Sequence, residues 1–256
     1  MIVVASATLV ACSGGTASPA TIAPESSVAP LPTAPVKTAV TDTTGGGPTS
    51  TTSTTTAPTT TGAGTLPAGV VGLSADGPWR LVDSAPGITA PGLVYELMPK
   101  LWVYLPVKED IAHGITWTFK EADRPIIEAY LHARLVYFQA ITSTPIDLTL
   151  PGWKQYYADG GAVYFPNLQQ RIAEGQVADL DVGVVLRPEV IGDGRTDTEA
   201  IVFDCVLDGG VFRMPDGSLA QGSTSGVVKS GISLRIDLHG SEWVVTQVGN
   251  QPDACL

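Results

Sequence analysis

The sequence predicts an α+β domain in which helices come first and an antiparallel sheet follows. Three observations lead to this fold class. The composition changes near Leu66, from a tract of small and polar residues to a mixture that can form a core. Apolar residues recur with helical spacing over residues 123–141. After Gly175 they alternate with polar residues, which is the spacing of strands.

The first segment is a short apolar run, residues 2–10, that leads through Ala11 to Cys12 and is followed by the sequence Ser-Gly-Gly. This arrangement resembles the lipobox of bacterial lipoprotein signal peptides. The resemblance implies that residues 1–11 are a signal peptide cleaved before Cys12, and that the Cys12 thiol is lipidated. The protein would then be held by its lipid anchor at the extracytoplasmic face of the plasma membrane.

The apolar run lacks the basic segment with which secretory signals normally begin, because no Lys or Arg precedes it. We expect that segment to lie upstream of residue 1. The alternative is an ordinary buried apolar segment that ends in Cys. Residues 2–11 are too few to cross a bilayer as a helix, and the polar tract that follows offers no core for them to join.

Residues 12–68 are predicted to be a disordered stalk behind the lipidated Cys12. The tract consists mainly of Thr, Ser, Pro, Gly and Ala, and its charged residues are Glu25, Lys37 and Asp42. Such a composition has too little apolar surface to offset the entropy of ordering. Ser/Thr/Pro tracts on outward-facing proteins are often O-glycosylated, and a bare flexible linker is the alternative.

The net charge of −11 limits the classes of partner. Nucleic acids require clusters of Lys and Arg, so we expect no nucleic-acid binding. A polybasic face on a membrane is excluded for the same reason. The sequence has no His and Cys residues at zinc-ligand spacing, and we expect no metal or other cofactor.

Three cysteines are present, and with Cys12 lipidated, Cys205 and Cys255 remain as a pair outside the reducing cytosol. A disulfide between them would close a loop of about 50 residues and contribute about 4 kcal/mol. It would tie the C-terminal tail to a strand. The alternative is two separate thiols, with Cys205 as a small buried apolar residue.

Residues 69–122 are predicted to be an irregular, β-rich extension, because Gly-Pro and Pro-Gly pairs interrupt its short apolar runs. Strands are expected at four places, residues 79–82, 93–97, 101–105 and 115–119. Three Trp residues gather in this segment, Trp79, Trp102 and Trp117. They could mark a partner or glycan surface, and the alternative that we favour is that they attach the segment to the main core.

A helix is predicted over residues 123–141, with Asp123 suited to the N-cap position. At 100° per residue, a narrow polar stripe runs along this helix opposite a wide apolar face. Arg134 lies in the middle of the apolar face, with Tyr130 and Tyr137 one turn before and after it. A charged residue at such a position needs a partner of opposite charge.

The later elements follow from the same patterns. A helical turn is expected at residues 153–157 and a helix at residues 165–175, because Gly175 suits the position after a helix end. Strands are then expected at four places, residues 182–190, 199–207, 232–238 and 243–248. In the second of these strands, four residues share one face, Ile201, Phe203, Cys205 and Leu207.

The order of these elements is similar to that of the nuclear transport factor 2-like fold. The likeness rests on residues 126–131, the helix that ends at Gly175, the strand at residues 200–205 and the terminal hairpin of residues 234–245. It covers about residues 123–248, so residues 123–256 are assigned as one such domain. The resemblance implies that the helices pack into the concave face of a strongly curved antiparallel sheet and form a cone. The whole chain is similar to actinobacterial lipoproteins that join a lipobox, a Thr/Pro stalk and such a domain.

Members of that family include isomerases, hydratases and cyclases, in which a carboxylate or a His works beside a Tyr, and also many domains without chemistry. No position of this chain matches those catalytic residues one by one. The resemblance therefore implies no catalytic residue here, because fold alone does not establish function.

Arg134 is the strongest candidate binding residue, together with Tyr130 and Tyr137. Its guanidinium could point into the cone and hold an anionic ligand group. The alternative is an internal ion pair, because a buried Arg needs a partner, and three carboxylates could supply it, those of Glu199, Asp204 and Asp237. Five tyrosines could donate hydrogen bonds to a ligand carbonyl or serve only as core or rim residues, namely Tyr130, Tyr137, Tyr156, Tyr157 and Tyr164.

The other polar residues indicate no site. His132 lies on the polar stripe of the helix, where we expect it to be exposed. His113 and His239 fall in a loop and a turn, without the neighbouring Ser or Cys of a catalytic triad. Asp193 and Asp197 flank a hairpin turn and lack the further oxygen ligands of a calcium loop.

These observations support three functions. The leading hypothesis is a lipid-anchored cell-envelope protein that binds a small apolar or amphipathic ligand, or an envelope partner, without catalysis. The alternative is an enzyme that uses a Tyr and a carboxylate of the cone for proton transfer, as an isomerase or hydratase does. The third is a structural partner in an envelope assembly, with no pocket. An apolar cavity with convergent polar groups favours the first two, and catalysis further needs a titratable group with a shifted pKa beside a Tyr.

Overall fold

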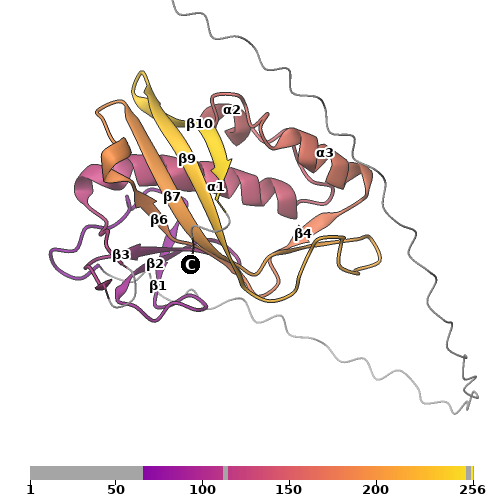
Figure 1. The fold of residues 1–256 in the computed structure, drawn as a ribbon, viewed down its shortest axis with the longest axis horizontal. Helices are drawn as coiled ribbons and strands as arrows, with labels where there is room; N and C mark the ends of the chain where they lie inside the picture. Colours follow the sequence, from indigo (N-terminus) through magenta and orange to yellow (C-terminus); the bar gives the residue numbers. More distant parts are fainter. Residues whose placement is uncertain (1–65, 112–114, 252–254, 256) are drawn as a thin grey trace, which may run out of the picture. The chain divides into compact units, whose positions relative to one another are not determined.

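Figure 1 shows the fold of the computed structural model, which describes residues 66–111, 115–251 and 255. The predicted signal peptide (residues 1–11), the predicted lipidation site Cys12 and nearly all of the predicted stalk (residues 12–68) lie outside these residues. Within the part that is described, no helix is both long enough and apolar enough to span a membrane.

The described part of the chain is built on one sheet of eight strands. Seven of them follow the order β1-β2-β3-β5-β7-β9-β10, and β6 pairs with β7 beside this path. Neighbouring strands are antiparallel except β3 and β5, which are parallel. The strands are β1 (Arg80–Val82), β2 (Gly92–Met98), β3 (Leu101–Pro106), β5 (Val184–Leu186), β6 (Pro188–Val190), β7 (Glu199–Asp208), β9 (Val228–His239) and β10 (Glu242–Asn250).

Three α-helices accompany this sheet within the described residues, α1 (Arg124–Thr142), α2 (Gly152–Tyr156) and α3 (Phe165–Ala173). Figure 1 shows α1 crossing the sheet, behind β7, β9 and β10 in that view. The helix begins where the sequence predicts, with Asp123 at the N-cap position. The Asp123 side chain does not cap the helix, however, because it forms an ion pair with Arg195.

The predicted nuclear transport factor 2-like cone is wrong. We expected residues 123–256 to form the domain, with helices packed on a curved antiparallel sheet. Instead, residues 69–122 supply β1, β2 and β3, and the pairing of Leu101 with Val184 joins them in parallel to β5. Three side chains of β3 are completely buried, those of Leu101, Val103 and Leu105, so this segment belongs to the core. The outcome is a large mixed sheet, beside which α1, α2 and α3 contain only 19, 5 and 9 residues.

Other strands also differ from the prediction. The strand expected at residues 115–119 is absent, and Ile115 forms only an isolated bridge with Asp110. Two strands of three residues were not predicted, β4 (Val177–Asp179) and β8 (Val211–Arg213), and they pair with each other in a small separate sheet. Three residues are too few to produce a recognisable alternation of apolar and polar side chains.

The core lies between α1 and the sheet. The α1 residues that are at most 1% exposed include four large ones, Ile126, Ile127, Tyr130 and Leu131. Complete burial of an Ile or Leu contributes about 1.5–3 kcal/mol each, so this face of α1 is a main source of stability. Trp153 of α2 and the neighbouring Tyr157 are also buried, and their rings lie 5.3 Å apart.

The segment before β1 covers the polar stripe of α1. The Ser74 N–H donates a hydrogen bond to Glu128 Oε1 at 2.7 Å. The Trp79 ring packs on His132, which in turn stacks on Tyr156 with ring centroids 4.8 Å apart. His132 is therefore half-buried rather than exposed as we expected, and burial lowers its pKa. Trp79 attaches this segment to the helix, in agreement with the favoured interpretation.

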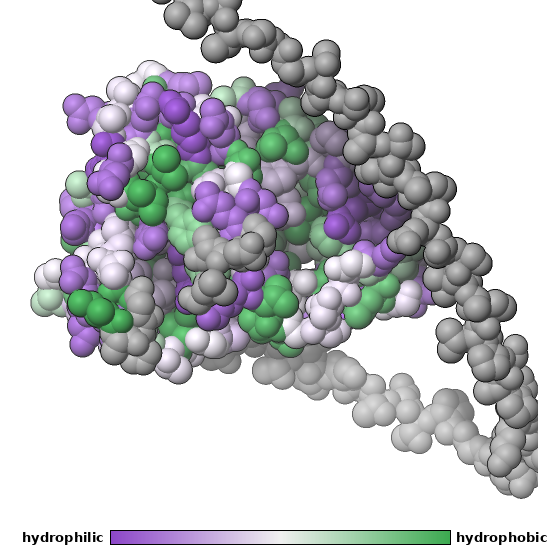
Figure 2. All heavy atoms as spheres, viewed as in Figure 1, coloured by the Kyte–Doolittle hydropathy of each residue, from purple (hydrophilic) through white to green (hydrophobic). Residues whose placement is uncertain are grey.

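Figure 2 shows the molecule from the side on which the strands lie in front of α1. Among the described residues visible there, apolar residues form several separate groups with polar residues between them. A broad continuous apolar patch on the surface usually indicates a site where a protein partner binds stably. The described residues on the visible face form no such patch.

Candidate ligand cavity

A cavity of about 340 Å³ lies between one end of α1 and the sheet. Its walls come from α1, from strands of the large and the small sheet, and from Tyr164, the residue before α3. The lining residues are Arg134, Tyr137, Phe138, Ile141, Tyr164, Ala178, Leu180, Val206, Asp208, Gly210, Val211, Phe212, Ser230, Ile232, Val248, Gly249 and Asn250. Its volume falls at the lower end of the range for small-molecule sites, and its walls are mostly apolar.

The spacing of residues on α1 brings Arg134 to this cavity. Residues three or four positions apart lie on the same face of a helix, so Arg134, Tyr137, Phe138 and Ile141 share one face. The Arg134 residue is only 6% exposed. The polar end of a long side chain is thus held inside the protein at the wall of the cavity.

Arg134 has no polar partner within the described residues. It makes no hydrogen bond or ion pair there, and its buried Nε atom is unsatisfied. The guanidinium lies over two aromatic rings instead, 5.1 Å from the centroid of Tyr137 and 5.0 Å from that of Phe138. Burial acts to lower the pKa of Arg134, but nearby Tyr hydroxyls and the Asp204 carboxyl group outweigh it and raise the pKa overall. The guanidinium therefore remains charged.

The three carboxylates that could have paired with Arg134 are all engaged elsewhere. Glu199 and Asp237 both form ion pairs with Arg235. Asp204 is completely buried and accepts hydrogen bonds from the Tyr130 hydroxyl and from the Arg187 N–H. It influences Arg134 through its charge but does not contact it as an ion pair. The internal ion pair that was the alternative for Arg134 is therefore not formed.

Asp204 and Arg187 explain why the strand predicted at residues 182–190 is interrupted. β5 and β6 keep the same register on β7, and Arg187 between them stands opposite Cys205. The backbone N–H of Arg187 donates a hydrogen bond to Asp204 Oδ1 at 2.6 Å. Its acceptor is therefore a side chain and not a backbone carbonyl of β7. Burial raises the pKa of Asp204, against the lowering effects of Arg134 and of these hydrogen bonds.

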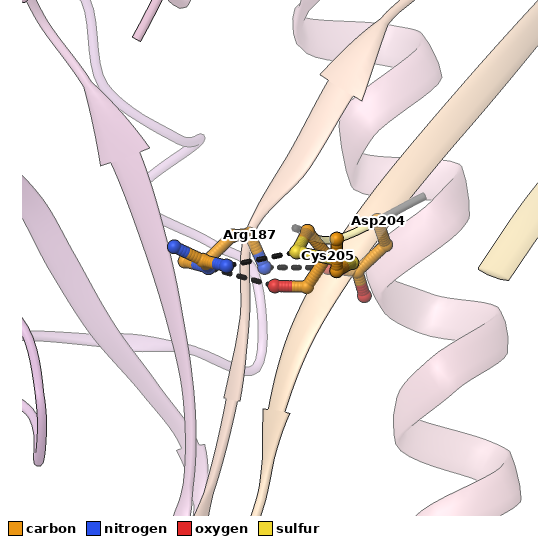
Figure 3. The surroundings of a disulfide bond; sticks show 4 residues. Arg187, Asp204 and Cys205 are labelled. Atoms are coloured by element: carbon orange, nitrogen blue, oxygen red, sulfur yellow. Dashed lines mark hydrogen bonds between the residues drawn. A yellow bond between two sulfur atoms is a disulfide. The ribbon is translucent and has the colours of Figure 1, made fainter. Parts of the chain in front are cut away.

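The cysteine pair lies on the other face of β7. Successive residues of a strand point to opposite faces, so Cys205 points away from the side to which Asp204 points. Cys205 and Cys255 form a disulfide with their Cα atoms 5.5 Å apart. Figure 3 shows dashed lines from Arg187 to Asp204 and to Cys205 of β7, and the Arg187 side chain donates a hydrogen bond to the Cys205 carbonyl at 2.7 Å. The disulfide connects Cys255, near the C-terminus, to the middle of the sheet.

Two further ionisable residues line the cavity, Tyr164, which is one of the candidate tyrosines of the sequence, and Asp208, which the sequence did not single out. The Tyr164 hydroxyl is buried near that of Tyr157 and makes no hydrogen bond of normal geometry within the described residues. Asp208, at the end of β7, is half-buried, and its Oδ1 accepts a hydrogen bond from the Gly210 N–H at 2.8 Å. Burial raises the pKa of Asp208, opposed by that hydrogen bond and by the charge of Arg134.

The predicted site residues thus divide into two groups. Arg134 and Tyr137 line the cavity, and Tyr130 does not, because it is completely buried and its hydroxyl is bonded to Asp204. His113 lies outside the described residues. Among the described residues, no group of three or more His, Cys, Asp or Glu side chains could hold a metal ion.

A larger cavity of about 420 Å³ is lined by Arg187, Glu189, Lys229 and the disulfide. Its Arg187 already donates hydrogen bonds to Cys205, and its Lys229 is exposed to solvent, so neither is a buried cation without a polar partner as Arg134 is. Burial raises the pKa of Glu189. We therefore regard the Arg134 cavity as the candidate site.

Comparisons with known proteins identify no family. No family model matches the chain, and no curated protein matches it. Among solved structures, the intermembrane space region of the chloroplast protein ARC6 is similar over 53% of this chain and 100% of that one, with a TM-score of 0.39 and 12% identity. A likeness at this level does not establish a shared fold or a shared function.

Proposed function

We propose that this domain binds a small amphipathic anion in the Arg134 cavity without transforming it, and that a lipid at Cys12 holds the protein at the extracytoplasmic face of the plasma membrane. The observation that carries the binding proposal is the Arg134 guanidinium, which is buried, charged and without a polar partner among the described residues.

A buried charge is costly unless it is paired. In Arg134 the two ring faces offset part of that cost, since a cation–π contact that is shielded from water contributes about 2 kcal/mol. A carboxylate or phosphate oxygen of a ligand would supply the missing partner, and the planar guanidinium suits bidentate hydrogen bonds to such groups. Retaining the charge at this position is thus explained by a ligand.

The remainder of the cavity fits an apolar ligand body. Its walls include four aliphatic side chains near the sheet, those of Ile141, Val206, Ile232 and Val248. A purely polar anion would leave these surfaces in contact with water. A molecule with an anionic head and a short hydrocarbon part satisfies both Arg134 and these walls.

The lipid anchor rests on the sequence alone. Its support is the apolar run that ends at Cys12, the small residues after it and the Thr/Pro-rich tract that would separate an anchored Cys12 from the domain. Mass analysis of the N-terminal peptide from the membrane fraction tests it. An N-terminal Cys12 that carries acyl chains is expected, and an unmodified thiol in the soluble fraction would contradict the anchor.

A second candidate function is proton transfer, because the cavity holds a carboxyl group with a raised pKa, Asp208, and a tyrosine with an unsatisfied hydroxyl, Tyr164. Both residues line the cavity, and neither is Tyr130. It would require a ligand that leaves the cavity altered. Incubation of a bound acid with the protein, followed by mass spectrometry and proton–deuterium exchange in heavy water, separates the two functions.

Binding is tested by calorimetry with octanoate, a simple amphipathic anion. We expect saturable binding to the wild-type protein and at least a tenfold loss with Arg134→Met, which removes the charge and keeps a side chain of similar length. Arg80→Met is the matched control, because Arg80 is exposed and pairs with Glu96 away from the cavity. Equal binding by wild type and Arg134→Met would refute the proposal.

Native mass spectrometry of the protein purified from its own membranes complements this test. A co-purified acid that is lost in Arg134→Met supports ligand binding. A domain without ligand that carries one stoichiometric protein instead supports the envelope-partner hypothesis and contradicts the small-molecule one.

A further inference from the structure

We infer that the ligand of the Arg134 cavity is an acid that also carries a hydrogen-bond donor, a hydroxyl or an ammonium group, and that Asp208 receives this donor. The inference rests on the proposed function and names the class of ligand.

The same cavity contains two side chains of opposite charge. Asp204, Val206 and Asp208 occupy alternate positions of β7 and therefore point to the same face of the strand, which is the face toward α1. Asp208 and Arg134 both line the cavity, and each affects the other electrostatically. Arg134 and Asp208 nevertheless form no ion pair, since no N–O distance between them is within 4.0 Å.

Two opposite charges that face one cavity without contact leave space for a molecule between them. If the two side chains served only stability, direct pairing would satisfy both. Asp208 uses Oδ1 for the Gly210 N–H at 2.8 Å, and its Oδ2 accepts no hydrogen bond from a described residue. One acceptor atom thus remains for a ligand, in the same cavity as the donors of Arg134.

The charge of Asp208 also excludes some ligands. A simple fatty acid would place its carboxylate on Arg134 and leave a hydrocarbon chain against the free oxygen of Asp208, so that this acceptor is buried without a donor. A second carboxylate in the cavity would be repelled by Asp208. A hydroxy acid or an amino acid with an apolar side chain satisfies both charged residues and still fills the apolar walls.

The test compares four ligands of equal chain length by calorimetry on the full chain, namely octanoate, α-hydroxyoctanoate, β-hydroxyoctanoate and α-aminooctanoate. Since a hydrogen bond to a charged acceptor corresponds to about tenfold or more in affinity, at least one donor-bearing acid should bind about tenfold more tightly than octanoate. Asp208→Asn should reduce this ratio to about twofold or less. Asp193→Asn, in an exposed turn, is the matched control and should leave the ratio unchanged.

The outcomes separate this inference from the proposed function. If octanoate binds as tightly as every donor-bearing acid and still depends on Arg134, the inference is wrong and the anion site stands. If none of the four acids binds, or if binding is indifferent to Arg134→Met, the anion site itself is refuted. The wild-type comparison decides the inference even if Asp208→Asn does not fold, which circular dichroism would show.

Discussion

The exchange of Arg134 for Met tests whether this residue serves the fold or a ligand. A buried arginine that belongs to an internal ion pair stabilises its partner, and removing it typically costs 3–5 kcal/mol. Arg134 has no such partner among the described residues. We therefore expect Arg134→Met to change the free energy of unfolding only slightly while ligand binding is lost.

The magnitude follows from the contacts of the side chain. Removing the buried charge with its unsatisfied Nε donor returns several kcal/mol. Losing the two ring contacts, at 5.1 and 5.0 Å and shielded from water, costs about 2 kcal/mol each. The two effects largely cancel, so the net loss should be no more than about 1 kcal/mol. In a domain of this size, 1 kcal/mol shifts Tm by about 2–4 °C, so Tm should fall by no more than about 4 °C.

Thermal unfolding followed by circular dichroism measures this effect, with Arg195→Met as the comparison. Arg195 pairs with Asp123, which is 3% exposed, so its removal leaves a buried carboxylate without its cation. The Arg195 side chain is 31% exposed, and we therefore expect a loss near the lower limit for a buried pair, about 3 kcal/mol. If Arg134→Met lowers Tm as much as Arg195→Met does, Arg134 is a structural residue and the reasoning fails.

Three further predictions concern stability. Replacing Cys205 and Cys255 by Ser should lower the free energy of unfolding by about 4 kcal/mol, because the disulfide closes a loop with a sequence separation of 50 residues. Urea unfolding with and without reductant measures this loss, and an unchanged unfolding midpoint would contradict it. Because burial lowers the pKa of His132, the folded protein favours the neutral imidazole, so His132 contributes stability above pH 6.5 that is lost as the pH falls below it. His132→Phe keeps an aromatic ring, and its Tm should decline less than that of the wild type between about pH 7 and 5; parallel declines would count against the sign. Gly161 has a φ of +85°, and an added Cβ would lie 2.3 Å from the Trp153 ring. Gly161→Ala should therefore lower the free energy of unfolding by about 2 kcal/mol or more, as measured by urea unfolding. A loss below about 0.5 kcal/mol would show that the Trp153 ring moves aside at little cost.

Helix α1 and its central arginine could be predicted because the information is local. The apolar spacing over residues 123–141 defines one wide face, and Arg134 stands out on it without knowledge of any other element. The remainder of the cavity comes from β4, β7, β8, β9 and β10, which the chain brings together only by folding. The sequence offers Tyr164 only as one of five candidate tyrosines, because nothing near it shows that its hydroxyl is buried.

The acidic residues of β7 are a signal that the sequence does contain. The alternation places Ile201 with the other odd-numbered residues on one face, but the structure leaves Ile201 38% exposed and buries the opposite face, with Val202 and Asp204 completely inaccessible. Two aspartates, Asp204 and Asp208, interrupt the apolar residues of that buried face. Acidic residues at even spacing within a buried strand indicate a functional or structural network.

The parallel pairing of β3 with β5 was beyond local reasoning, because parallel and antiparallel strands have the same alternation of side chains and the partners are far apart in the sequence. The topology matters for anyone who expresses part of this protein. A fragment that starts at α1 would lack β3, and the backbone donors and acceptors of Val184, Val185 and Leu186 along that edge would face solvent. All three side chains are at most 1% exposed in the intact fold. An uncovered apolar edge of this kind recruits strands from other molecules, so such a truncation would be expected to precipitate rather than to yield a smaller working unit.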